Sequence, residues 1–80
     1  MTLFVFVSAP DLMRSNKCVF KKENWNGPVP PKDDTVWVNE NAIKVKQVQW
    51  NLTSEEVSII GKVYSNDEYD MLETVSVDKA

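Results

Sequence analysis

Histidine is absent from this 80-residue chain, and glycine, cysteine and arginine are scarce. Histidine is the commonest general base and metal ligand in proteins, so its absence removes every Ser-His-Asp and Cys-His arrangement. The two glycines, Gly27 and Gly61, are too few for the usual phosphate-cradling loop. These absences predict a protein that binds and is not an enzyme. We expect neither a cofactor nor a metal ion.

Cysteine occurs once, at Cys18, which excludes an internal disulfide and a cysteine-based zinc site. A small fold without disulfides is typical of a reducing compartment. No apolar run approaches the roughly 20 residues needed to span a bilayer. The apolar stretch 3–7 has no basic residue before it and is shorter than a signal-peptide core, so a buried strand explains it better. We expect a cytoplasmic protein with no membrane partner.

Strand signals dominate a chain long enough for one domain, residues 1–80. The predicted strands cover residues 3–7, 17–21, 35–38, 42–50, 57–64 and 68–74. Residues 22–34 form a long, proline-containing connection, and residues 11–16 predict at most a short helical turn. Residues 75–80 predict a short edge strand or a frayed end. The fold class is mainly β: a small, strongly bent antiparallel sheet or SH3-like barrel of five to six strands, with an open meander or OB-like sheet as alternative.

The strand at 42–50 carries an irregular apolar period. Val45 and Val48 are three residues apart where alternation requires two, which predicts a bulge near residues 46–47. With that bulge, Val48 and Trp50 point to the same side as Val45. We therefore expect Trp50 in a core that also contains Phe4 or Phe6.

The turn at 39–41 leaves the orientation of Trp37 open. A three-residue loop would point Trp37 into the core, and a four-residue loop would point it outward, because one residue of slip exchanges the two faces of a strand. In the strand predicted at residues 57–64, Gly61 predicts a bend. The sequence also leaves open whether Trp25 is in the core.

The net charge of −3 is unevenly distributed. Residues 1–50 carry seven basic and five acidic side chains, whereas residues 51–80 carry two basic and seven acidic ones. Acidic side chains around the tyrosines of the last third predict a surface for a basic protein partner, with simple surface charge as the alternative. The candidate partner-binding residues are Tyr64, Asp67, Glu68, Tyr69, Asp70 and Glu73.

A second candidate surface combines tryptophan with lysine. Aromatic rings stack on bases and ammonium groups meet phosphates, so such a face suits a small anionic, nucleotide-like ligand held between subunits of an oligomer. The candidate ligand-binding residues are Lys21, Lys22, Trp37, Lys44 and Lys46. Because the chain is acidic overall, we do not expect a nucleic-acid partner.

The run Asp34-Thr35-Val36-Trp37-Val38 followed by Ile43-Lys44-Val45 resembles small phage-type β-proteins. The resemblance is one of pattern, covers about half of the chain and carries over no site residue. It implies a phage or mobile-element accessory protein that binds a host protein in the host cytoplasm, as an inhibitor or adaptor, including one of a defence system. A self-assembling virion protein is a further alternative, and a homo-oligomer is compatible with the sequence.

Overall fold

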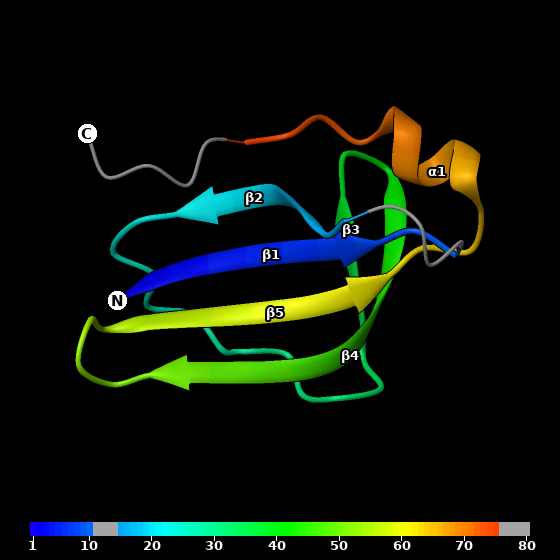
Figure 1. The fold of residues 1–80 in the computed structure, drawn as a ribbon. Coiled ribbons are helices and arrows are strands. Elements are labelled where there is room, and N and C mark those ends of the chain that lie inside the picture. Colours follow the sequence, from blue (N-terminus) through cyan, green and yellow to red (C-terminus); the bar gives the residue numbers. More distant parts are fainter. Residues whose placement is uncertain (11–14, 76–80) are drawn as a thin grey trace.

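Five strands form one curled sheet in the order β2-β1-β5-β4-β3 (Figure 1). The computed structural model describes residues 1–10 and 15–75. Its elements are β1 (Thr2–Ser8), β2 (Lys17–Lys22), β3 (Thr35–Val38), β4 (Asn41–Asn51), β5 (Glu56–Lys62) and a short helix, α1 (Asn66–Met71). The prediction of a mainly β, strongly bent small sheet is confirmed. No helix in the described part of the chain is long and apolar enough to cross a bilayer.

The sheet is mixed, which corrects the expectation of purely antiparallel pairing. β1 pairs with β5 in parallel, and the other neighbouring strands pair antiparallel. β2 and β3 are the two ends of the strand order, so the sheet forms a half-barrel. The connection between them is fastened at both ends: Trp25 N–H donates to Met1 O, and Asp33 N–H donates to Val45 O. Trp25 lies half-buried against the core, which answers the question that the sequence left open.

Aliphatic side chains fill the concave face of the half-barrel. Leu3 lies opposite Val57 and Val5 opposite Ile59, and all four are buried in one cluster. The expectation that Phe4 or Phe6 belongs to this cluster is wrong: Phe4 is buried, but on the other face of β1, because successive side chains of a strand point to opposite faces. Their rings lie on the other side of β1, with centroids 6.1 Å apart.

The predicted bulge in β4 is present. The register with β5 shifts between Val45 and Gln47, and Val48 then pairs with Ile59 on the core face. Trp50 pairs with Val57 on the same face but is 52% exposed, so the prediction of a buried Trp50 is wrong. The strand phase was correct. Trp50 is exposed because the loop facing it leaves an open groove, described below.

The β3–β4 hairpin has a two-residue loop, shorter than either predicted alternative. Val38 pairs with Asn41, so only Asn39 and Glu40 form the turn, and both have positive φ, 48° and 70°. Positive φ at both positions is the mark of the tight turn that matches the twist of paired strands. This register places Trp37 outward, with 69% of its surface exposed.

We expect Glu40→Gly to stabilise the protein by about 1 kcal/mol, because a non-glycine residue in the left-handed region is strained and Asn-Gly is preferred in this turn. The measurement is the melting temperature, which should rise by roughly 4–8 °C for a domain of this size. Glu55→Gly, at the other strand-connecting turn with φ 54°, is the matched test. A fall in melting temperature for Glu40→Gly would contradict the turn geometry.

Helix α1 replaces the strand predicted at 68–74, and β5 ends at Lys62 and not at Tyr64. Ser65 caps the helix: Glu68 N–H donates to Ser65 Oγ at 3.2 Å, and Tyr64 N–H donates to Glu68 Oε2 at 3.2 Å. The Ser-x-x-Glu spacing is that of a capping box, although the Glu68 carboxylate accepts from the N–H of Tyr64, the residue before the N-cap, and not from that of Ser65.

After the helix, Val75 N–H donates to Cys18 O, which places this residue beside β2. Of the predicted helical turn at 11–16, residues 11–14 lie outside the described residues, and residues 15–16 are not helical. Residues 76–80, expected to pair at an edge or to fray, also lie outside the described residues.

Candidate functional site

The acidic candidate residues lie on and beside α1. Asp67, Asp70 and Glu73 are exposed, and Tyr64, just before the helix, is 70% exposed. Glu68 is half-buried and its carboxylate serves the helix cap. The structure therefore gathers most of this set on one surface, but one of its carboxylates has a structural role.

Tyr69 is not the exposed anchor that the sequence suggested. It is half-buried against the core, and its hydroxyl donates to Ser15 O at 2.6 Å. Lys17 Nζ lies 4.1 Å from the centre of its ring, a favourable cation–π contact. Tyr69 thus fastens α1 to the start of β2.

The basic candidate set is divided between opposite edges of the sheet. Lys21 and Lys22 are on β2, whereas Trp37, Lys44 and Lys46 are on β3 and β4. Lys21 Nζ lies 3.8 Å from Glu23 Oε1 and 5.9 Å from the ring centre of Phe4, on the convex side. One pocket lined by all five residues is therefore not formed.

Lys44 and Lys46 instead share a pocket with a lysine that the sequence argument missed. Lys62 on β5 pairs directly with Lys44 on β4. The pocket has a volume of about 290 Å³ and is lined by Pro10, Lys44, Lys46, Lys62, Val63 and Tyr64. Within the described residues, these three lysines form no ion pair. Only the β4–β5 register reveals Lys62 as their neighbour.

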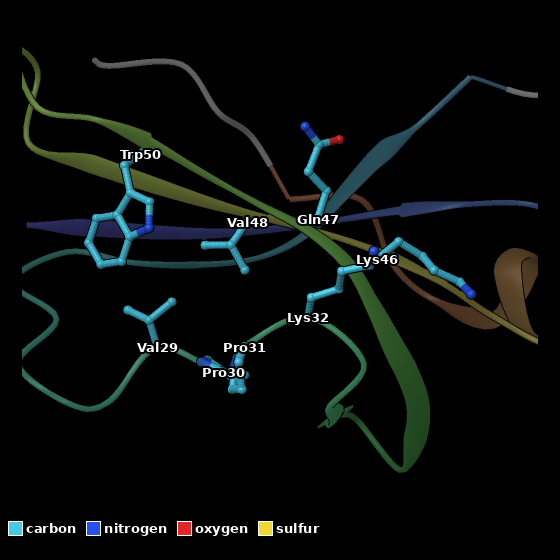
Figure 2. Close-up of a pocket in the computed structure, with 8 residues that line it drawn as sticks. All are labelled: Val29, Pro30, Pro31, Lys32, Lys46, Gln47, Val48 and Trp50. Carbon is cyan, nitrogen blue, oxygen red and sulfur yellow. The ribbon is translucent and has the colours of Figure 1, made fainter.

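A larger groove of about 700 Å³ runs between β4 and the proline loop, residues 29–32. Figure 2 shows Val48 and Trp50 reaching from β4 toward the loop, and Val29 and Pro30 lie on the loop, across the groove from them. Its remaining lining residues are Pro31, Lys32, Lys46 and Gln47. The groove therefore joins an apolar part to a part with two lysines.

The backbone edge of β4 is unpaired where it borders this groove. Pairing with β3 ends at Lys44, and Val45 exchanges hydrogen bonds with Asp33 and Asp34. Among the described residues, 47–51 pair only with β5, and Lys46 is the unpaired residue of the bulge. The loop opposite cannot seal this edge fully, because Pro30 and Pro31 have no N–H to donate. An open strand edge is a template for another strand.

Reactive groups are few in the described chain. Burial raises the pKa of the Cys18 thiol, and the same thiol donates to Phe20 O at 3.4 Å, so it remains protonated and unreactive at neutral pH. Among the described residues, no cluster of three or more carboxylates and cysteines is arranged to hold a metal ion.

No family model, curated protein or solved structure matches this chain. The phage-type origin and the host-protein partner therefore stay predictions.

Proposed function

We propose that this protein is a non-catalytic binding protein that captures an extended, acidic segment of a partner protein in the groove between β4 and the proline loop. The observation that carries the proposal is the unpaired edge of residues 46–51, which borders a groove that is partly apolar and partly lined by lysines. An inhibitor or adaptor of a host protein, as the phage-type pattern implies, would work by such stoichiometric capture.

The mode of binding is strand addition. A partner segment laid along residues 46–51 would hydrogen-bond the open edge and extend the sheet, so that backbone pairing supplies affinity and alternate side chains supply specificity. Six residues of strand span roughly 20 Å. Apolar side chains of the segment would contact Val48 and Trp50, the apolar residues that β4 contributes to the groove.

Charge selects the class of segment. Lys32 and Lys46 line the groove, so acidic side chains are favoured beside the apolar ones. A second copy of the chain is a poorer occupant, since its densest acidic stretch within the described residues is the helix α1 and not an extended strand.

Trp50→Ala should weaken the binding of such a segment at least tenfold, because aromatic anchors carry a large share of interface energy. The probes are fluorescent ten-residue peptides that alternate valine, leucine or phenylalanine with glutamate, measured by anisotropy. Trp37→Ala is the matched control, since Trp37 is also exposed but does not line the groove. It should change affinity by less than about twofold.

Two further readouts make the test specific. Two versions of a binding peptide are compared, one N-methylated on its odd-numbered residues and one on its even-numbered residues. Only one of the two should lose binding, since alternate N–H groups face the sheet. Trp50→Ala should melt within a few degrees of wild type, because the side chain is half exposed. Absence of binding by all the peptides, or equal losses for both tryptophan variants, would overturn the proposal. A dimer mass for the wild type, lost in Trp50→Ala, would place a second copy in the groove.

The acidic surface on α1 is the second candidate. Two large side chains there, Tyr64 and Met71, are 70% and 72% exposed beside Asp67 and Asp70, which favours docking on a basic protein. If a partner is lost on Met71→Glu and retained on Trp50→Ala, the contact belongs to α1 and not to the groove.

A further inference from the structure

We propose that the pocket of Lys44, Lys46 and Lys62 binds a small phosphate-bearing anion, with the Tyr64 ring at its rim to receive a planar group such as a base. This site goes beyond the capture of a protein segment. Lys46 also borders the groove, whereas Lys44, Lys62 and Tyr64 line only the lysine pocket.

Lys44 and Lys62 form a like-charge pair across two strands. Lys44 and Lys62 are directly opposite in the β4–β5 register, where side chains begin about 5 Å apart and like charges destabilise the sheet. No described carboxylate forms an ion pair with either ammonium group. A bound anion would be attracted by both ammonium groups and would offset their mutual repulsion.

The bulge adds a third positive charge. In the register, Val45 faces Gly61 and Gln47 faces Ile60, so Lys46 is the extra residue of β4 and has no partner in β5. Bulges re-aim side chains and are enriched beside binding sites. Here the bulge leaves Lys46 lining the same pocket as the Lys44–Lys62 pair.

Size and surroundings define the ligand class. A volume of about 290 Å³ suits a compact ligand, and ammonium groups bind phosphate as point charges. The Tyr64 ring offers a stacking face that tolerates any base. The net charge of the chain is −3, which disfavours a long polyanion. These features favour pyrophosphate or a nucleoside phosphate over a nucleic-acid strand.

The test measures melting temperature and calorimetric binding with pyrophosphate and with adenosine diphosphate, in sodium chloride of equal ionic strength. We expect millimolar pyrophosphate to raise the melting temperature of the wild type by roughly 5 °C. Lys62→Gln should abolish this rise, and without ligand it should melt at or above the wild type because the repulsion is gone. Lys22→Gln, which replaces an exposed lysine of β2 outside both the pocket and the groove, should retain the rise.

Tyr64→Ala separates the two ligand sources. A loss of at least threefold in affinity for adenosine diphosphate, with pyrophosphate unchanged, identifies a nucleotide, and no change for either identifies the phosphate group alone. Persistence of the rise in Lys62→Gln, or an equal rise in sodium chloride, would overturn the site. The site would also be overturned if both Lys62→Gln and Asp11→Asn lowered the melting temperature. Asp11 follows the pocket residue Pro10, so that result would mean that the lysines hold a carboxylate of their own chain. Peptide binding by the groove stays measurable in the Lys62→Gln variant, so the two proposals fail separately.

Discussion

Ile59→Ala will lower the free energy of unfolding by about 3–4 kcal/mol, and Ile60→Ala, its neighbour in β5, will cost roughly half of that or less. The two residues carry the same side chain in the same strand and point to opposite faces. Ile59 is 1% exposed within the core cluster, whereas Ile60 is half-buried on the convex side opposite Phe6. The comparison therefore isolates what the concave core contributes.

Urea unfolding of both variants measures the difference, with the slope of the transition as a check that the unfolded state is unchanged. A loss of this size removes much of the stability expected of a small domain, so both variants are measured in a stabilising salt that keeps Ile59→Ala folded. Equal losses for the two variants would mean that both faces of the sheet are packed alike, contrary to the burial pattern.

Gly61→Ala is expected to cost about 2–3 kcal/mol although it adds a single methyl group. Gly61 lies inside β5 between Val7 on β1 and Val45 on β4, at a point where β4 packs closely against it. An added Cβ would overlap Ile43 Cγ2 and lie 3.0 Å from Lys44 O, which is backbone and cannot rotate away. The glycine is required because β4 approaches it closely, through the Ile43 side chain and the Lys44 backbone.

A double-variant cycle tests this explanation. Ile43→Ala removes the overlapping atom, so Gly61→Ala should cost at least about 1 kcal/mol less in that background than in wild type. Ser58→Ala, in the same strand but on the other face, is the control and should change stability little. A full, undiminished cost in the Ile43→Ala background would assign the strain to the Lys44 carbonyl alone.

Local patterns in the sequence predicted much of the fold. The strand positions and the bulge follow from alternation, because the three-residue step from Val45 to Val48 is readable without any knowledge of neighbours. The parallel direction of β1 against β5 was not predictable, since alternation is the same in parallel and antiparallel strands. Burial of Trp50 was mispredicted for a related reason: its face was correct, but what covers that face depends on a distant loop.

Two local signals were present and outweighed by apparent strand patterns. Ser65 and Glu68 have capping-box spacing, and Asn39 suits the first position of a two-residue turn, although Glu40 does not suit the second. The candidate sites depended more on tertiary structure. Lys44 and Lys46 could be selected from their spacing, but Lys62 joins them only through the strand register, and the open edge of β4 exists only because pairing with β3 stops early.

The parallel pairing of β1 with β5 affects how the chain folds during its synthesis. Leu3, near the start of the chain, has its partner Val57 more than 50 residues later, so β1 leaves the ribosome long before its second neighbour has been translated. Until then β1 has only β2 beside it, and its aliphatic side chains lack the opposite wall of the core. Closure at such sequence separation carries a large loop-entropy cost and slows folding toward the millisecond-to-second range of all-β domains. The nascent chain therefore completes its sheet only once β5 is available to pair with β1.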